Sequence, residues 1–435
     1  MNNVDWNSLD APGRDALLAR PRIESNAELE AIVGEIIANV RQRGDKALRD
    51  YSRRFDRVPA DALWQDTASA PALEPKLDAA LDRAIATVRA FHAAGKPSDY
   101  AVETAPGVHC RMRWLALDPV GLYVPAGTAP LPSTAVMLLV PALLAGCRRI
   151  VLTTPPNAHG RADDAVLAVA ARLGLDKVLV SGGAQAIAAM AYGTESVPAC
   201  VKLFGPGNRF VAEAKRQTAL DVRGAAQDLP AGPSEVLVIA DATANPEWVA
   251  IDLLSQAEHG PDSQVLLVTD SGALAEAVAE RVEALLKSLS RAETTAKALE
   301  YAAIVRVSDM DQAVEVSERY APEHLIIQTR DANAVAERIR TAGSVFVGHH
   351  TPESLGDYIS GTNHTLPTGG WARTTSGLAV IDFMRRMTLQ QATPDGLAKL
   401  GPPAARIAAH EGLDAHRLAI ELRIAADTGA DGNAQ

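Results

Sequence analysis

The sequence predicts an α/β protein with two parallel β-sheets, on three observations. From Val120 onward, short runs rich in β-branched and aliphatic residues alternate with stretches of helical periodicity. The short runs are continuously apolar, as in strands that helices cover on both faces. The same alternation occurs again after DLPAGPS (228–234), a segment rich in Pro and Gly. Alternating strands and helices build parallel sheets, so two Rossmann-like domains are expected.

The expected strands and helices follow from the apolar runs and from the helical periodicity between them. In the first series the strands are GLYVP (121–125), RRIVLTT (148–154), KVLVSG (177–182) and VKLFGP (201–206), with helices at 133–146, 162–173 and 184–192. In the second series the strands are SEVLVIAD (234–241), QVLLVTD (264–270), AAIVRV (302–307), HLIIQT (324–329) and SVFVG (344–348).

Small helical segments are expected toward both ends of the chain. Amphipathic helices are predicted at about 26–44 and 74–94, where apolar residues recur at helical spacing. A last helical segment is predicted at about 404–426. The first two carry no cluster of chemical groups, so we interpret them as scaffold.

Composition and charge exclude several classes of protein. The 435 residues suffice for about three domains. The net charge is −11, no run is rich in Lys or Arg, and aromatic residues make up only 4%, which argues against a nucleic-acid surface. The N-terminus, MNNVDWNSLD, is polar and acidic and is not a signal peptide. The longest apolar run, AVMLLVPALLAG from Ala135, is too short to cross a bilayer.

The cysteines indicate a reducing environment. Cys110, Cys147 and Cys200 are widely separated and form no C-x-x-C pair. An odd, sparse set of this kind fits the cytosol better than a disulfide framework, so a cytoplasmic location is expected. Each cysteine is interpreted as a small buried apolar residue rather than a catalytic thiol.

Glycine-rich strand ends raise the question of a bound nucleotide. No G-x-G-x-x-G follows any expected strand, and GPGNRF (205–210) has Phe210 where the third glycine would stand. SGGAQ (181–185) and FGPGN (204–208) both lie where a strand meets a helix N-terminus, and their backbone N–H groups suit a phosphate. They are equally compatible with ordinary strand-to-helix turns.

Two pairs of polar residues are candidates for chemistry. Gln256 and His259 close a helix-like run and lie on one face at i, i+3 spacing, which suits half of a metal site or a polar helix end. Glu323 and His324 stand at the start of an expected strand. They suit a general-base pair, or a surface glutamate beside a partly buried histidine.

Further metal ligands would have to come from distant segments. Asp357 and His364 lie in SLGDYISGTNH (354–364), and HEGLDAH (410–416) contains three more candidates, His410, Glu411 and His416. Gln256, His259, Asp357 and a C-terminal histidine would form an oxygen and nitrogen shell for Zn²⁺. Spacing alone does not assemble this shell, and a structural role stays open for His364 and His410.

Several blocks together resemble the histidinol dehydrogenase family, over nearly the whole chain to about residue 426. The blocks are VGLYVPAGTAPLPST (120–134), SGGAQAIAAMAYGTESVP (181–198), KLFGPGN (202–208), DLPAGPSEVLVIAD (228–241), LSQAEHGPDSQ (254–264), APEHLIIQT (321–329) and SLGDYISGTNHTLPT (354–368). The resemblance implies oxidation of L-histidinol to L-histidine with NAD⁺. The nearest alternative is an NAD-dependent dehydrogenase of another small polar alcohol on the same scaffold.

The resemblance also implies a role for particular residues. The catalytic pair would be Glu323 and His324, and one Zn²⁺ per subunit would be bound by Gln256, His259, Asp357 and His416. NAD would contact Tyr123, Gln185 and Asn208. The substrate would contact Ser234, Gln256, His259, His324, Asp357, Glu411 and His416.

The same resemblance implies a domain division and a partner. Residues 1–24 would form an N-terminal segment, 25–121 with 232–375 a discontinuous α/β domain with the metal and catalytic residues, and 122–231 the NAD-binding domain. Residues 376–435 would form a C-terminal dimerisation domain. The expected assembly is a homodimer in which C-terminal residues complete the partner's site, without nucleic acid or membrane.

Overall fold

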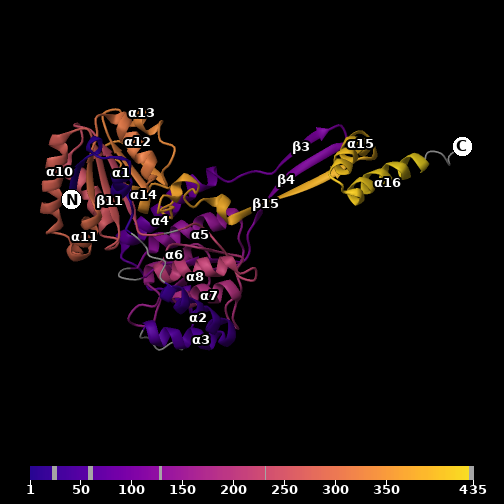
Figure 1. Cartoon of the computed structure of the whole chain (residues 1–435). Helices are drawn as coiled ribbons and strands as arrows, with labels where there is room; N and C mark the ends of the chain where they lie inside the picture. The colour runs from indigo at the N-terminus through magenta and orange to yellow at the C-terminus, as the bar shows by residue number, and fades with distance from the viewer. Residues whose placement is uncertain (22–26, 57–61, 127–129, 231, 431–435) are drawn as a thin grey trace. The chain divides into compact units, whose positions relative to one another are not determined.

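The fold is that of a computed structural model that describes residues 1–21, 27–56, 62–126, 130–230 and 232–430, with side chains to residue 426. The chain divides into two compact units (Figure 1). The first comprises Met1–Gly95 and Leu117–Phe383, and the second comprises Lys96–Ala116 and Met384–Gln435. Each unit is described by itself. The expected boundary at residue 24, part of the 120–134 block and Ala231 lie outside the described residues.

One sheet of the first unit is centred on β10 and is called the β10 sheet. Its strand order is β1-β12-β11-β10-β13-β14, and all of its pairs are parallel. The strands are β1 (Asn2–Asp5), β12 (Ala303–Arg306), β11 (Gln264–Thr269), β10 (Glu235–Ala240), β13 (His324–Gln328) and β14 (Ser344–Val347). Every residue of β10, β11 and β13 is buried, as the continuous apolar runs predict.

The other sheet, the β5 sheet, repeats the connectivity of the β10 sheet. Its strand order is β2-β7-β6-β5-β8-β9. In both sheets the strand that comes first in the predicted series, β5 or β10, lies between the second strand of that series, β6 or β11, and the fourth, β8 or β13. The strands are β2 (Trp64–Asp66), β7 (Lys177–Val180), β6 (Ile150–Thr154), β5 (Val120–Tyr123), β8 (Lys202–Phe204) and β9 (Ala226–Gln227). Only the edge strand β2 is antiparallel to its neighbour among the described pairs. The predicted α/β class with two parallel sheets is confirmed.

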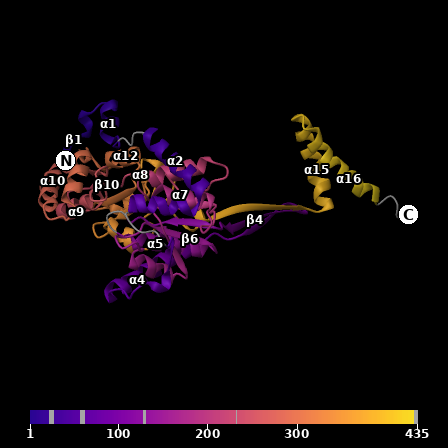
Figure 2. The same cartoon turned by 90° about the horizontal axis from the view of Figure 1, so that it is seen from below.

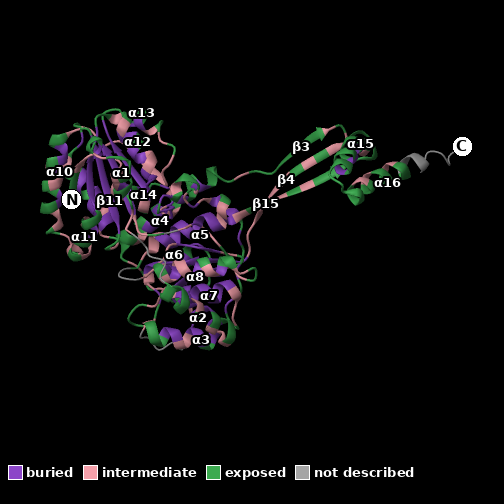
Figure 3. Ribbon diagram, in the orientation of Figure 1, coloured by how far each residue is buried: buried purple, intermediate pink, exposed green. Residues whose placement is uncertain are grey.

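Helices of the first unit pack around the two sheets, whose buried strands form the core (Figure 3). On the β5 side they are α5 (Pro132–Ala145), α6 (Asp164–Arg172), α7 (Gly183–Tyr192) and α8 (Arg209–Leu220). On the β10 side they are α9 (Pro246–Ala257), α10 (Gly272–Leu286), α11 (Ala292–Ala298), α12 (Met310–Tyr320), α13 (Ala332–Ala336) and α14 (Glu353–Tyr358). Shorter turns of helix lie at Trp6–Ser8, Ser52–Asp56, Thr67–Ser69, Leu299–Tyr301, Trp371–Arg373 and Val380–Phe383.

The N-terminal helices are α1 (Ala11–Leu18), α2 (Ala27–Arg43), α3 (Asp45–Tyr51) and α4 (Pro75–Ala94). The apolar stripe of α2 packs on α7 and α8, and α4 packs on α5. Residues 27–56 and 62–94 therefore pack with the β5 sheet, which differs from the expected grouping of 25–121 with 232–375. The physical reason is that an amphipathic stripe shows that a helix is half buried, but not which sheet it covers.

The described part of the second unit contains a three-stranded antiparallel sheet and two helices. The sheet order is β15 (Met384–Ala392), β4 (Val108–Ala116), β3 (Tyr100–Ala105). α15 (Pro394–His410) and α16 (Asp414–Ala430) pack on each other as a hairpin (Figure 2). One helical segment was expected at about 404–426; instead two helices meet at Glu411–Leu413, where Gly412 has a φ of 72°. No helix in the described part of the chain is long and apolar enough to span a membrane.

Candidate active site

Acidic and imidazole side chains gather at the amino ends of β10 and β13. Glu235 opens β10, and Glu323 and His324 stand at the start of β13, where Val236 and His324 are in register. α9 follows β10 and returns antiparallel to it, which brings its last turn with Gln256 to the same edge. Doubly wound sheets usually bind ligands at their carboxyl ends, so this group lies at the less usual edge.

The main chain of Glu235 holds the Glu323–His324 pair. Its N–H donates to Oε2 of Glu323 at 2.8 Å, and its carbonyl oxygen accepts from Nδ1 of His324 at 3.0 Å. A carbonyl can only accept, so Nδ1 carries the hydrogen and the lone pair of neutral His324 is on Nε2. Nε2 is buried without a hydrogen-bond partner among the described residues. In the neutral ring Nε2 is therefore the basic nitrogen, and it lies 3.5 Å from Oδ1 of Asp357.

Neighbouring carboxylates raise the pKa of this imidazole. Burial would lower the pKa of His324, but Glu323 and Asp357, each with an oxygen 3.5 Å from a ring nitrogen, raise it well above its usual value. Burial in turn raises the pKa of Glu323, against the opposing effect of His324. The two side chains, both nearly inaccessible to solvent, form a coupled acid–base pair.

Gln256 is a buried amide with unused hydrogen-bonding capacity. Neither polar atom of its side chain has a hydrogen-bond partner of normal geometry in the described chain, although the amide is near enough to Glu353 to lower the pKa of that carboxyl. His259 follows one turn later. Part of its side chain reaches solvent, yet the protein packed around the ring lowers its pKa, against the field of Asp357. A neutral imidazole and an unpaired amide both suit a metal.

The loop after α14 joins this edge to the β5 sheet. Nδ1 of His364 donates to the carbonyl oxygen of Asp357 at 2.8 Å, and its Nε2 lies 3.1 Å from the hydroxyl of Thr134, in the first turn of α5. The Asn363 amide donates to the carbonyl oxygen of Met137 at 2.7 Å. Both ring nitrogens of His364 are thus hydrogen-bonded to protein groups. One partner follows the β10 sheet and the other follows β5, so His364 connects the two halves of the first unit.

Glu353 is a buried acidic residue of this site that the sequence reasoning missed. Its Oε1 accepts from the Ser255 hydroxyl at 2.9 Å, and its Oε2 is buried without a partner among the described residues. Burial raises the pKa of Glu353 to about 7, against the lowering effect of His324. The sequence does offer one indication of this residue: Glu353 stands four residues before Asp357, and residues i and i+4 of a helix lie on the same face.

The expected nucleotide contacts all lie at the carboxyl edge of the β5 sheet. Tyr123 ends β5, and its hydroxyl accepts from the Gly183 N–H at 3.2 Å. Gln185 is buried in the first turn of α7, and Asn208 caps α8 by accepting from the N–H groups of Phe210 and Val211. Two helix N-termini and a glycine-rich turn therefore adjoin these side chains, which suits an anionic ligand.

The remaining expected residues are divided between the units. Ser234 directly precedes β10 in the first unit. Glu411 caps α15, His410 is the last residue of that helix, and His416 lies in the first turn of α16, all exposed in the second unit. Of the four expected zinc ligands, Gln256, His259 and Asp357 belong to the first unit, where Asp357 lies close enough to His259 to affect its pKa. No cluster of three or more His, Cys, Asp or Glu side chains able to hold a metal is formed by the described residues.

Comparisons with known proteins point to one family. A family model described as histidinol dehydrogenase matches residues 19–424. The chain is 52% identical to the histidinol dehydrogenase of Xanthomonas campestris over 98% of this chain and 99% of that protein, and 50% identical to that of Idiomarina loihiensis over 96% of each. The crystal structure of histidinol dehydrogenase from Elizabethkingia anophelis, 38% identical, matches with a TM-score of 0.94 over 98% of this chain and 99% of that one.

Proposed function

The chain belongs to the histidinol dehydrogenase family, and on that premise we propose how its residues oxidise histidinol in histidine biosynthesis. L-histidinol is oxidised to L-histidinaldehyde, and the hydrated aldehyde is then oxidised to L-histidine. NAD⁺ is the hydride acceptor in both steps. The observation that carries the proposal is the buried Glu323–His324 pair with a basic Nε2, held by the main chain of Glu235.

The two members of the pair have different tasks. In the first oxidation, Nε2 of His324 takes the hydroxyl proton as the hydride leaves the carbinol carbon. Glu323 then removes a proton from the water that adds to the aldehyde, and His324 again accepts a proton in the second oxidation. The raised pKa of Glu323 supports its role, because a general base works best when its pKa lies near the working pH. The carboxylates of Glu323 and Asp357 beside His324 stabilise the proton that its ring accepts.

Zinc is proposed to bind Gln256, His259 and Asp357, with His416 as the fourth ligand. The support is the buried Gln256 amide without a normal partner, the lowered pKa of His259 and the closeness of Asp357. Such an oxygen and nitrogen set is compatible with Zn²⁺. The metal would bind nitrogen atoms of the substrate and act as a template without redox chemistry.

NAD is proposed to lie at the carboxyl edge of the β5 sheet, in contact with Tyr123, Gln185 and Asn208. The support is the N-termini of α7 and α8 beside these residues. The loop that links Asp357 to Thr134 brings that edge next to the Glu323–His324 pair, as hydride transfer requires. In the proposed division, 122–231 is the NAD-binding domain and 232–375 carries the catalytic and metal residues.

A homodimer is proposed in which Glu411 and His416 of one subunit complete the other subunit's site. Residues 376–435 would then serve dimerisation. The support is the set of exposed large apolar side chains on the α15–α16 hairpin, of which Ile407 and Leu422 are more than 60% exposed. Apolar side chains in such numbers favour burial against another chain. The sparse, unpaired cysteines agree with a cytoplasmic location.

One assay tests the proposed reaction. Purified protein is given a known amount of L-histidinol with excess NAD⁺, and the NADH formed is counted with and without a chelator. We expect two NADH per histidinol and a loss of activity on chelation that Zn²⁺ restores. One NADH per histidinol would point to a simple alcohol dehydrogenase, the alternative on this scaffold. Full activity after exhaustive chelation would rule out the zinc role.

A further inference from the structure

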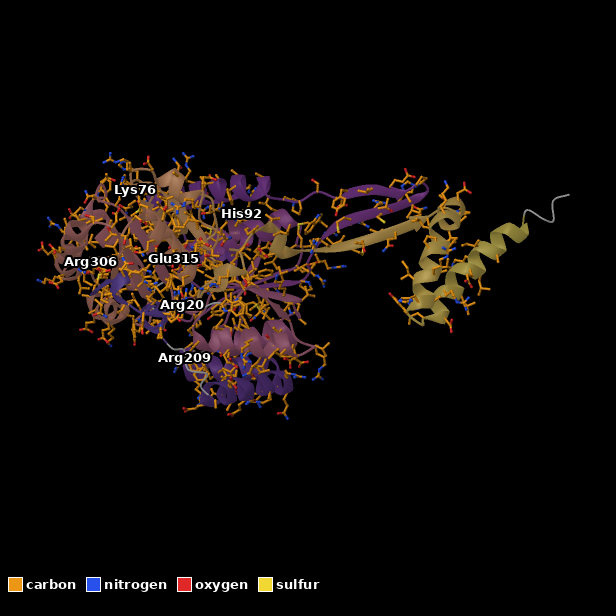
Figure 4. The ribbon with its side chains drawn as sticks, turned by 45° about the horizontal axis from the view of Figure 1, so that its top comes forward. Arg20, Lys76, His92, Arg209, Arg306 and Glu315 are labelled. Atoms are coloured by element: carbon orange, nitrogen blue, oxygen red, sulfur yellow. The ribbon has the colours of Figure 1, made fainter. Side chains whose placement is uncertain are left out.

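Arg20, which is labelled in Figure 4, comes from the N-terminal segment and pairs with Glu235 at the amino edge of the β10 sheet. Its Nε donates to Oε1 of Glu235 at 2.5 Å, and a terminal nitrogen donates to Oε2 at 2.9 Å. The glutamate side chain is only 4% exposed. Oε1 also accepts from the Gly369 N–H at 2.7 Å. A two-point pair of this kind fixes the direction of the carboxylate as well as its charge.

The same guanidinium holds the turn that leads into β13. It donates to the carbonyl oxygens of Tyr320 and Ala321 at 2.8 and 3.3 Å, and it lies 4.0 Å from the centre of the Tyr320 ring. Ala321 has a φ of 55°, and it is the non-glycine residue with a left-handed backbone in the described chain. Such a conformation is strained for a residue with a Cβ atom and persists only where neighbours impose it.

Arg20 is itself anchored from both sides. The Tyr320 hydroxyl donates to Oε1 of Gln264 at 2.9 Å, and the Gln264 amide donates to the carbonyl oxygen of Ala19 at 3.0 Å. The segment before α2 is thus tied to β11 and to the end of α12. Its arginine is placed by the fold and is not a mobile surface cation.

We propose that Arg20 is a positioning residue for the Glu323–His324 pair. It acts at two points: it fixes Glu235, whose main chain bonds to both members of the pair, and it fixes the Tyr320–Ala321 turn directly before them. This role rests on the proposed function of Glu323 and His324. It extends the active site to the N-terminal segment, which carries no chemical motif of its own.

Charge supports the same role. Glu235 lies close enough to raise the pKa of Glu323, and the Arg20 cation opposes the Glu235 charge. Loss of Arg20 would leave a buried carboxylate unpaired beside the proposed base. Lysine would supply a charge but not the planar fork that reaches Glu235 and two carbonyl oxygens at once.

The test compares Arg20→Lys and Arg20→Met with Arg14→Met. Arg14 is a matched control, because it also comes from the N-terminal segment, stacks on Trp6 at 4.9 Å and donates to its carbonyl oxygen, but has no described bond to Glu235 or to the turn. In both Arg20 variants we expect kcat to fall about 10²-fold, the effect of a small misplacement of reacting groups, with little change in the KM for NAD⁺. The acid limb of the kcat profile should move to higher pH in Arg20→Met, which also loses the charge that opposes Glu235. Arg14→Met should keep wild-type values.

Several outcomes would overturn the positioning role. They are wild-type kcat in a folded Arg20→Lys protein, an equal loss in Arg14→Met, or failure of both Arg20 variants to fold, which would make Arg20 purely structural. Glu323→Gln is measured in parallel. If that variant keeps aldehyde oxidation, the proposed function of Glu323 fails. If it is inactive while the Arg20 variants are active, only the positioning role fails.

Discussion

His324 donates the hydrogen of Nδ1 to the carbonyl oxygen of Glu235 at 3.0 Å, which leaves Nε2 as the basic nitrogen of the ring. Because the acceptor is a main-chain atom on a buried strand, the tautomer is set by the register of β10 against β13. The N–H of the same residue donates to Oε2 of Glu323. One residue of the sheet thus orients both members of the proposed base pair.

Glu323→Gln should separate the two half-reactions. The amide keeps the size of the side chain but cannot take a proton from water, so we expect oxidation of L-histidinaldehyde to fall by about 10²–10⁴-fold, the usual contribution of a general base. Oxidation of L-histidinol to the aldehyde should be nearly preserved, because His324 takes that proton. Each half-reaction is measured by NADH formation in a single turnover. His324→Gln is the comparison and should lose both steps. An equal loss of both steps in Glu323→Gln would contradict the division of tasks.

Gln256→Ala should weaken zinc binding and activity together. Removal of a direct ligand should lower zinc affinity by at least about tenfold, since even changes to groups behind the ligands cost that much. Zinc affinity is measured by competition with a chelator of known strength, and activity is assayed with saturating Zn²⁺. Gln217→Ala is the control, because that amide is bonded to Glu30 and Glu213 away from the site. Unchanged zinc affinity in Gln256→Ala would remove this residue from the ligand set.

The central strands could be predicted from the sequence because burial on both faces gives an unbroken apolar run, as in β11, where all of Gln264–Thr269 is buried. The strands of the second unit gave no such run. β15 reads MRRMTLQQA and is exposed or half-buried at every position, so neither the apolar pattern nor a covering helix marked it. The expectation of helices alone at the C-terminal end was therefore incomplete.

The candidate site could be predicted only in part. The spacing of Gln256–His259 and of Glu323–His324 was compatible with a functional site and also with a purely structural role. Only the family resemblance favoured the functional interpretation. Arg20 and Glu235 were out of reach, because they are 215 residues apart and meet only through the strand order. The expected use of His416 stays a prediction, since it belongs to the second unit.

Gly205→Ala should impair nucleotide use. Gly205 has a φ of 113°, and a Cβ there would lie 2.1 Å from the Tyr123 carbonyl oxygen, so the turn before Asn208 would have to move. We expect a clear rise in the KM for NAD⁺ with a smaller change for histidinol. Gly174→Ala is a matched control, since its φ is 84° but nothing lies within 4 Å of the added carbon. It should lose only about 1–2 kcal/mol of stability from backbone strain and keep its KM values. Equal KM values in the two variants would argue against a nucleotide at this turn.

Asp252→Asn should flatten the pH dependence of stability. Burial raises the pKa of Asp252 to about 7, although its Oδ2 accepts from the Gln328 amide at 2.7 Å. A carboxyl with a raised pKa in the folded state favours folding while it is protonated, and that contribution is lost as pH rises from about 4 through 7. The asparagine carries no charge and keeps an acceptor for Gln328. We expect it to raise the free energy of unfolding at pH 8 by ~4 kcal/mol relative to wild type, because burial moves this pKa from 3.8 to about 7 and each tenfold change in proton affinity between the folded and unfolded states is worth about 1.4 kcal/mol. The gain should vanish near pH 4. A difference between the two proteins that does not depend on pH would show that Asp252 is not the titrating group.

Subunit mixing should reveal whether the C-terminal segment acts in the partner's site. Gln256→Ala alters the first unit, and His416→Asn alters the second unit, so each homodimer should be inactive. In a mixed dimer with exchanged C-terminal segments, one site combines the native Gln256 of one chain with the native His416 of the other. Co-expression should then restore about a quarter of wild-type activity, because half of randomly assembled two-fold dimers are mixed and each has one intact site of two. If each His416 served its own chain, every site in the mixture would contain one altered ligand and no activity would return. Differently tagged chains and two-step purification isolate the mixed dimer, whose zinc content should be one ion per dimer if the exchange occurs.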